Sequence, residues 1–529
     1  MTLNLTTTTR GLAMMLMATA VLFACSKNAS EEGTKAFNSV IPKPSSAKAT
    51  GKAFFISDKT VIQAEGAEAQ AVANYLREAL SKSVGVTLNT DGEKANENVI
   101  NLALTGNNDL GAEGYKVDID EKQVNISAST PAGLFYGVQT LRQLLADKKE
   151  GSSADSWEVA AGSIEDRPEY EWRGSMLDVA RHFFSVEDVK RYIDLISYYK
   201  MNKLHLHLSD DQGWRIEIKS WPDLTAIGGI SQVGGGKGGF YTQEQYKDIV
   251  AYAQSRFVTI VPEIDLPGHI NAALVSYPGL NVGVPIVLEK GNNKPVAGRP
   301  YTGIEVGFST LDIKKDLTFK FVNDVVREIS EITPGPYFHV GGDEAAVTKK
   351  PDYIAFVNRF KEIVKANGKK MIGWEEIAQG DLDSTVIAQH WHSEKYAKEA
   401  ADKGAKLIFS PSKKVYLDMQ YDSTSRLGLH WAAYIEVDSS YMWDPATRVP
   451  GIDREAILGV EAPLWSETIA TMDDIEYLLF PRLPGIAEIG WTKASDRNWD
   501  EYKVRLASHA PKWKAMGIDY YESPQVDWK

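Results

Sequence analysis

Two adjacent acidic residues follow a short apolar run beyond the middle of the chain. The run from Tyr337 to Val340 has the aromatic and β-branched composition of a buried strand, and it ends in Gly341 and Gly342. Asp343 and Glu344 come directly after the glycines. Because neighbouring side chains of a strand point to opposite faces, these acids can serve one site only if the backbone leaves strand geometry, which glycine permits. The pair could carry acid–base chemistry on one substrate, or it could be two solvated acids in a turn.

The elements that must position this pair form a regular series. Strand-like runs alternate with amphipathic helices from about residue 166 onwards, which indicates parallel βα units. The expected strands cover 174–179, 203–208, 258–264, 337–340, 370–373, 386–390, 406–409 and 459–464. Eight such strands close a (β/α)8 TIM barrel. We therefore predict an α/β protein whose barrel occupies residues 166–529, with 281–299 as a long loop over the barrel mouth.

Acidic, basic and aromatic residues follow the ends of these strands, where TIM barrels keep their active sites. Carboxylates and arginine can bind sugar hydroxyls, and indole rings can stack on a sugar ring. These residues are Arg181, Asp210, His269, Asp343, Glu344, Trp374, Trp391, Tyr416, Asp418, Trp431, Trp465 and Glu467. Each also has a structural interpretation. The tryptophans could pack the barrel, His269 could be a buried histidine with its hydrogen bonds satisfied, and Arg181 and Glu467 could form a structural ion pair.

Several ordered blocks of the sequence resemble glycoside hydrolase family 20, the β-N-acetylhexosaminidases. They lie at 172–183, 203–215, 262–269, 339–344 and 462–467, and the last four include HLHLSDDQGWR, PEIDLPGH, HVGGDE and APLWSE. The resemblance covers about residues 50–528. It implies a TIM barrel preceded by a small α/β domain, and an exo-acting retaining enzyme that removes terminal β-linked GlcNAc or GalNAc without a metal or cofactor.

The resemblance also implies a mechanism in which the substrate supplies its own nucleophile. Glu344 would protonate the glycosidic oxygen and later activate water. The 2-acetamido oxygen would attack the anomeric carbon and form a cyclic oxazolinium ion. Asp343 would bind the acetamido N–H and stabilise the charge that forms. Adjacent acids suit this route, because they are badly placed to flank a bond from opposite sides.

The other roles follow from the same match, residue by residue. Tyr416 would hydrogen-bond the acetamido oxygen, and a box of tryptophans would surround its methyl group and the sugar face. The hydroxyls would be held by Arg181, Glu467 and Asp418. The box residues are Trp374, Trp391 and Trp465; Asp210 and His269 would form a pair that tunes Glu344, and Trp431 would be a platform for the leaving sugar.

A smaller domain is expected ahead of the barrel. Residues 51–165 predict an α/β (α+β) sandwich, with a helix over 67–83, a strand over 98–105, a hairpin of 115–119 and 123–128, and a helix opening at Pro131. Residues 26–50 are polar and contain prolines, which is typical of a flexible tether.

The first 25 residues predict a bacterial lipoprotein signal. A polar start with Arg10 precedes a short apolar run that ends in Leu22-Phe23-Ala24-Cys25, and Cys25 is the one cysteine of the chain. We expect lipidation at Cys25 and, because Ser26 follows rather than Asp, sorting to the outer membrane, facing the periplasm or the cell surface. The alternative is an ordinary secretory peptide that happens to contain a cysteine.

Two other functions remain open at this stage. Histidines 205 and 207 share one side of a strand and, with Asp210, Asp265, His269 and Asp343, could form a metal-dependent hydrolase site. A non-catalytic glycan-binding lipoprotein would also explain the tryptophans and the leader. The net charge of −13 argues against a nucleic-acid partner.

Overall fold

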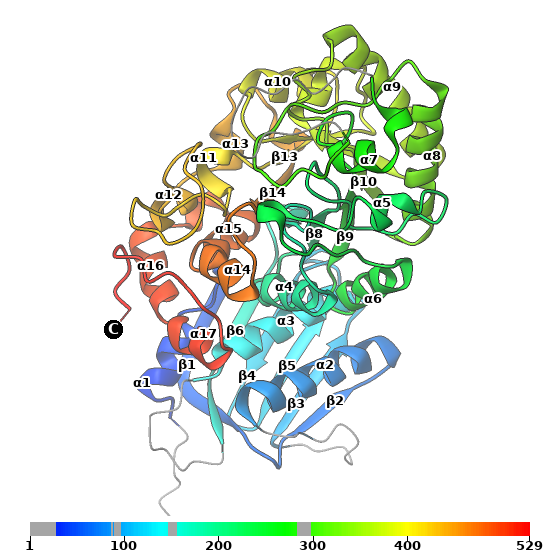
Figure 1. Ribbon diagram of the computed structural model, residues 1–529. Coiled ribbons are helices and arrows are strands. Elements are labelled where there is room, and N and C mark those ends of the chain that lie inside the picture. Colours follow the sequence, from blue (N-terminus) through cyan, green and yellow to red (C-terminus); the bar gives the residue numbers. More distant parts are fainter. Residues whose placement is uncertain (1–27, 86–87, 89–96, 147–155, 283–297, 529) are drawn as a thin grey trace, which may run out of the picture.

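The computed structural model of the protein describes residues 28–85, 88, 97–146, 156–282 and 298–528. Within these residues the chain forms a six-stranded sheet followed by a closed barrel of eight strands. Figure 1 shows the small sheet, coloured blue to cyan, below the barrel. The predicted fold class, a TIM barrel preceded by a small α/β domain, is confirmed.

The barrel strands are parallel throughout and run in chain order around the barrel. Each predicted strand is present, with ends that differ by at most two residues. The strands are β7 (Trp172–Asp178), β8 (Lys203–His207), β9 (Thr259–Glu263), β10 (Tyr337–His339), β11 (Lys370–Trp374), β12 (Ile387–His390), β13 (Lys406–Phe409) and β14 (Ile457–Leu464).

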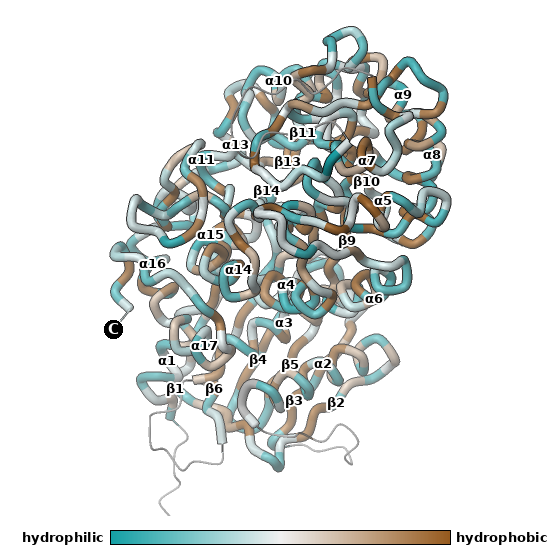
Figure 2. Tube along the Cα trace, viewed as in Figure 1, coloured by the Kyte–Doolittle hydropathy of each residue, from teal (hydrophilic) through white to brown (hydrophobic). Residues whose placement is uncertain are grey.

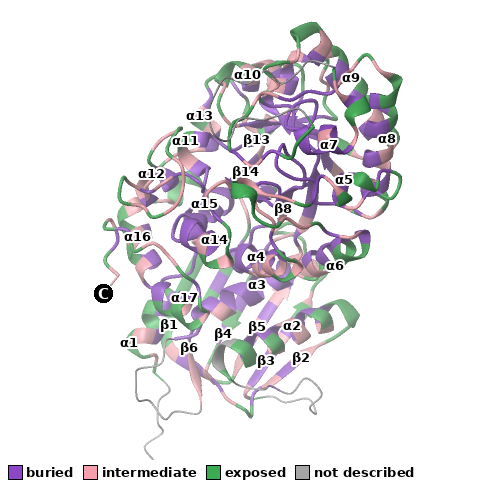
Figure 3. Ribbon diagram, in the orientation of Figure 1, coloured by how far each residue is buried: buried purple, intermediate pink, exposed green. Residues whose placement is uncertain are grey.

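Several helices outside the barrel, such as α4 and α8, are amphipathic, whereas α15 is buried along its whole length. Ser185 and Thr242 each form a capping box, so α4 and α6 begin at fixed residues. Figure 3 shows buried strands inside and helices such as α8 with one buried and one exposed face. These helices are α4 (Val186–Tyr198), α5 (Asp223–Ala226), α6 (Gln243–Gln254), α7 (Asn271–Ser276), α8 (Asp316–Glu331), α9 (Lys350–Ala366), α10 (Glu394–Asp402), α11 (Ser412–Val415), α12 (Val437–Tyr441), α13 (Pro445–Arg448), α14 (Met472–Leu479), α15 (Arg482–Trp491), α16 (Trp499–Ala507) and α17 (Ala510–Ala515).

The small domain is a two-layer structure. Its strand order is β1-β6-β4-β5-β3-β2, and the predicted antiparallel hairpin of β4 and β5 is present. Burial alternates along β4, because one face of the sheet packs on helices α2 and α3. Figure 2 shows hydrophobic residues along its strands. Its elements are β1 (Ser46–Ile56), β2 (Val61–Ala64), α2 (Ala67–Val84), β3 (Val99–Leu104), β4 (Tyr115–Ile119), β5 (Gln123–Ala128), α3 (Pro131–Leu144) and β6 (Trp157–Asp166).

The two domains share a packed interface at the end of the barrel away from the acid pair. Trp491, the last residue of α15, lies in the small-domain core with its ring centroid 5.4 Å from that of Tyr136. Its indole N–H donates to Asp166 Oδ1 over 3.0 Å, and the buried Lys200 ammonium lies 3.7 Å from the other oxygen of Asp166. The small domain therefore supports the barrel from the end opposite the acid pair, and none of its described side chains lies at the acid pair.

The prediction of a flexible tether over 26–50 is wrong for the residues that the structure describes. Residues Glu31–Phe37 form helix α1, which Ser30 caps, and β1 begins at Ser46 and pairs with β6. Phe37, Val40 and Ile41 are buried. The polar composition concealed these few apolar anchors, which are enough to hold the segment against both domains.

Two other sequence features fall partly or wholly outside the description. The leader and Cys25 precede residue 28, and the predicted long loop coincides with residues 283–297 apart from its ends. Among the residues that were searched, no helix is both long and apolar enough to cross a bilayer.

Candidate active site

The acid pair lies at the carboxyl end of β10, in a turn that depends on glycine. Gly341 and Gly342 have φ values of 66° and 102°, and Glu344 has the unusual value of 45°. A Cβ atom on Gly341 would lie 1.9 Å from Asp265 Oδ1, so a side chain has no room there. Gly342 N–H donates to the same Asp265 oxygen over 2.9 Å. The turn thus brings both acids to one side of the barrel rim.

The two acids differ in their surroundings. The Asp343 residue is 8% exposed, whereas the Glu344 side chain is 38% exposed. Burial raises the pKa of Asp343, with His269 opposing this effect and Glu344 adding to it. One imidazole nitrogen, His269 Nε2, lies 4.0 Å from Asp343 Oδ2 and 3.4 Å from Glu344 Oε2. The acids therefore face a common centre, and a turn with two solvated acids does not describe them.

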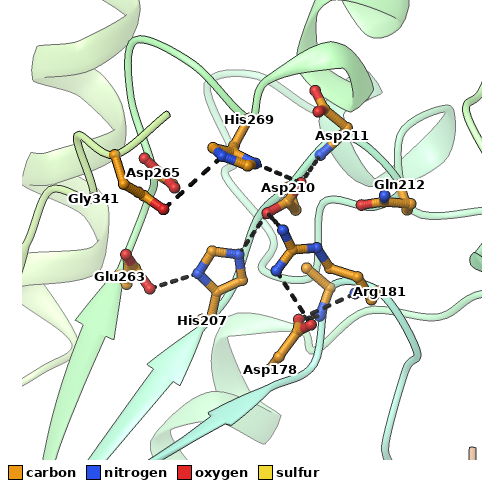
Figure 4. A network of polar contacts seen from close by, with 12 residues as sticks. Asp178, Arg181, His207, Asp210, Asp211, Gln212, Glu263, Asp265, His269 and Gly341 are labelled. Carbon is orange, nitrogen blue, oxygen red and sulfur yellow. Dashed lines mark hydrogen bonds and ion pairs between the residues drawn. The ribbon is translucent and has the colours of Figure 1, made fainter. Parts of the chain in front are cut away.

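A buried chain of charged groups holds His269 in place (Figure 4). His269 Nδ1 lies 3.2 Å from Asp210 Oδ1, and Arg181 pairs with the other oxygen of Asp210 over 2.8 Å. Burial alone would lower the pKa of His269, but Asp210 and nearby carboxylates outweigh burial and hold this pKa well above its usual range. His269 is thus a positively charged neighbour of Glu344, and Asp210 is the group that fixes it.

An aromatic wall stands beside the acids. One buried cluster contains Trp374, Tyr416 and Trp465. The distance between ring centroids is 5.8 Å for the two tryptophans and 6.3 Å for Tyr416 and Trp465. Trp391 packs against this cluster, with its ring 6.3 Å from that of Tyr416 and nearly parallel to it. Trp431 lies 6.0 Å from Tyr416 and is 55% exposed. The structure therefore brings together every aromatic residue that the sequence assigns to the site.

Two carboxylates next to this wall have buried oxygens without a partner. Asp418 is buried and Glu467 is half-buried, and among the described residues neither oxygen of Asp418 nor Glu467 Oε2 has a hydrogen-bond partner. Burial, and then the nearby Glu467 carboxylate, raise the pKa of Asp418 well above its usual range. Among the described residues Arg181 pairs with Asp178 and Asp210 rather than with Glu467. Buried acceptors of this kind are suited to ligand hydroxyls, so a simple Arg181–Glu467 ion pair is not supported.

The structure adds residues that sequence reasoning passed over. Asp178 accepts the backbone N–H groups of Ala180 and Arg181, which fixes the start of the loop after β7. Glu376 accepts the indole N–H of Trp391 over 3.2 Å. The sequence signal was present in both cases, because each is an acid at a predicted strand end, but no spacing rule distinguishes them from solvated acids.

The arrangement of His205 bears on the metal alternative. His205 Nδ1 binds Glu461 Oε1 over 2.8 Å, and its Nε2 lies 3.0 Å from Glu263 Oε2. Burial lowers the pKa of His205, but the two carboxylates outweigh it and raise the pKa to about 9. Metal ligation needs a neutral imidazole. Histidine and acid groups of suitable spacing do occur along the rim, and the chelator experiment below addresses them.

The fold and the site together define a barrel hydrolase with a sugar-binding rim, and the comparisons give its family. The chain matches the catalytic domain of glycosyl hydrolase family 20 over residues 170–494 and domain 2 of that family over 38–167. The chain belongs to glycosyl hydrolase family 20.

Three relatives match this chain over nearly their whole length. A β-N-acetylhexosaminidase of Cellulomonas fimi is 39% identical over 498 residues, which is 92% of this chain and 97% of the relative. The solved family 20 β-N-acetylhexosaminidase of Streptomyces coelicolor A3(2) is 48% identical, with a TM-score of 0.87 and coverage of 93% and 99%. A variant of the Streptomyces plicatus β-hexosaminidase, solved with its product GlcNAc, is 47% identical, with a TM-score of 0.87 and coverage of 93% and 98%.

Proposed function

We propose that the protein is an exo-acting, retaining β-N-acetylhexosaminidase that removes terminal β-linked GlcNAc or GalNAc from glycans or chitooligosaccharides. The observation that carries this proposal is the placement of Asp343 and Glu344 around His269, beside a wall of three buried aromatic rings. The family relationship and the enzymes named above support the same activity.

The first step joins proton transfer to attack by the substrate. Glu344 donates its proton to the glycosidic oxygen as the bond from that oxygen to the anomeric carbon breaks. The acetamido carbonyl oxygen forms a new bond to the same carbon and closes the oxazolinium ring. Asp343 accepts the acetamido N–H and stabilises the positive charge, while Tyr416 donates to the acetamido oxygen. Because Asp343 is buried, water screens its interaction with this charge less than it would at the surface.

The second step returns the enzyme to its first state. The Glu344 carboxylate takes a proton from water, and the water oxygen attacks the anomeric carbon and opens the ring. Two displacements at one carbon give net retention of configuration. Arg181, Asp418 and Glu467 hold the hydroxyls of the terminal sugar, as an exo-acting site requires.

Turnover of aryl glycosides by the pure protein tests this function. Aryl β-N-acetylglucosaminide or β-N-acetylgalactosaminide should be hydrolysed, and the first sugar released should be the β-anomer. A protein that binds these compounds without turnover would be a glycan-binding lipoprotein instead. A panel of substrates that differ at C4 then separates gluco from galacto preference.

Removal of metal ions should leave the activity unchanged. The proposed steps use carboxylates, an imidazole and the substrate's own amide, so no step requires a Lewis acid. We expect protein dialysed against EDTA to keep its kcat on an aryl β-N-acetylglucosaminide, measured beside an undialysed sample. Loss of activity that zinc restores would favour the metal-dependent hydrolase over this proposal.

We further propose that the mature protein is a lipoprotein of the bacterial outer membrane, anchored through Cys25 and facing the periplasm or the cell surface. The support is the sequence Leu22-Phe23-Ala24-Cys25 after an apolar run, with Cys25 as the one cysteine of the chain. A single acyl signal binds membranes weakly, whereas the several acyl chains of a bacterial lipoprotein anchor stably.

Substitution of the cysteine tests the anchor. In a Gram-negative host, Cys25→Ser should move the activity from the membrane fraction to the soluble fraction. Ser26→Asp is the matched control, because it keeps the cysteine and should shift the protein only from the outer to the inner membrane. Membrane association that survives Cys25→Ser would overturn the proposed anchor.

A further inference from the structure

A carboxylate inside the barrel contacts both halves of the proposed site. Glu263 ends β9 and has no exposed surface. Its Oε1 accepts the indole N–H of Trp374 over 2.9 Å, and its Oε2 lies 2.5 Å from His207 Nδ1. Trp374 belongs to the aromatic wall, and His207 leads to the acid–base group. The Trp465 ring also packs against both residues, at 4.9 Å from His207 and 5.8 Å from Trp374, but Glu263 is the side chain that accepts a hydrogen bond from Trp374 and pairs with His207.

His207 connects Glu263 to Glu344 through Asp210 and His269. Its second nitrogen, Nε2, lies 2.9 Å from Asp210 Oδ2. Both nitrogens therefore face carboxylate oxygens, and an imidazole can donate from both only when it is protonated. Asp210 in turn pairs with Arg181 and with His269, as Figure 4 shows. Every group between Glu263 and Glu344 is buried, and the last contact is a charge contact of 3.4 Å between His269 Nε2 and Glu344 Oε2.

We propose that Glu263 is a positioning residue that couples the aromatic wall to the acid–base group, through Trp374 on one side and through His207, Asp210 and His269 on the other. It does not touch the substrate in this arrangement. The inference rests on the proposed hexosaminidase activity, and it adds a residue in the middle of the barrel to a site otherwise built at its rim.

Glu461 provides a matched comparison within the same barrel. It is a second glutamate without exposed surface, on β14, and it binds Trp172, His205 and Gln389. Trp172 and Gln389 lie outside the proposed site, whereas His205 is shared with Glu263, whose Oε2 lies 3.0 Å from His205 Nε2. A purely structural role for buried carboxylates predicts similar consequences for both glutamates, whereas the coupling role predicts consequences for catalysis only at Glu263.

The direction of the pH effect follows from the charges. Burial lowers the pKa of His207, but Glu263 and the hydrogen bond to Asp210 outweigh it and raise this pKa well above its usual range. Without the Glu263 charge, the pKa of His207 falls and the imidazolium is lost at lower pH. The alkaline limb of the rate profile should then move toward acid. The charged groups that face Glu263 and His207 are His205, His339, Asp265, Asp343, Asp178 and Asp210.

The experiment compares Glu263→Gln, His207→Gln and Glu461→Gln with the wild type. Three quantities are measured: kcat/KM across aryl leaving groups of different pKa, the pH profile, and the affinity for a stable thiazoline analogue of the oxazolinium ion. Glu263→Gln should lose about 100-fold in kcat/KM on poor leaving groups and less on good ones, as weakened acid catalysis requires. It should also bind the analogue more weakly and show the acid-shifted alkaline limb.

His207→Gln removes the contact from Glu263 toward the acid–base group and leaves the hydrogen bond from Trp374 to Glu263 in place. It should reproduce the leaving-group dependence of Glu263→Gln and keep the wild-type affinity for the analogue, because Trp374 remains held. Glu461→Gln should keep the wild-type pH profile and leaving-group dependence. The proposed coupling is overturned if Glu263→Gln resembles Glu461→Gln in these measurements. If Glu263→Gln does not fold, His207→Gln takes its place in this comparison. A wild type without hexosaminidase activity would instead remove the proposed function.

Discussion

Glu344→Gln should lose about 100- to 10,000-fold in kcat/KM on a chitooligosaccharide, the range in which general acid catalysis contributes. Glutamine keeps the size of the side chain and its contact with His269, but it carries no transferable proton. The sugar leaving group is a poor one and depends fully on protonation. An aryl leaving group whose phenol has a low pKa needs no such protonation. The rate of the first step on such a substrate should therefore fall much less.

The comparison between leaving groups is the internal control of this prediction. A general defect in folding or binding would lower both rates together, and circular dichroism and the affinity for a competitive inhibitor would detect it. Glu376→Gln is a useful second control, because Glu376 is another acid beside the wall but contacts Trp391 rather than His269. Full activity of Glu344→Gln on a natural disaccharide would remove Glu344 from the role of acid.

Substrates that lack the 2-acetamido group should react at least about 1,000-fold more slowly. A nucleophile within the same molecule has an effective molarity that no group of the protein replaces here. Asp343 cannot act as a substitute nucleophile, because it follows the same strand as Glu344 and lies beside it rather than across the bond. Aryl β-glucosides and β-N-acetylglucosaminides with the same leaving group measure the difference. Similar rates on both would refute the substrate-assisted route.

Much of the architecture could be predicted from the sequence because its signals are local. The strands of the barrel are short apolar runs between helices, and capping boxes at Ser185 and Thr242 fix the starts of two of these helices. The gathering of acids and aromatics at one rim follows from the parallel direction of the strands. Each residue assigned to the site from the sequence lies at this rim within the described residues, although their roles in catalysis stay predictions.

The parts that could not be predicted depend on contacts between distant segments. Glu263 belongs to a recognised block, but its partners lie on β8 and β11, and only the register of the closed barrel brings His207 and Trp374 to its two oxygens. The segment 28–50 was mistaken for a tether because its few apolar residues find partners more than 100 positions away, as Ile41 N–H does at Gln143. Composition alone does not contain such information.

The most direct test of the central claim varies the nucleophile and nothing else. The measurement is kcat/KM for aryl β-glycosides whose 2-acetamido group carries zero, one, two or three fluorines, all with the same leaving group. If the amide oxygen attacks the anomeric carbon, each fluorine withdraws electron density from it, and kcat/KM should fall steeply along the series. A flat series would show that another nucleophile breaks the bond and would contradict the assigned roles of Asp343 and Glu344.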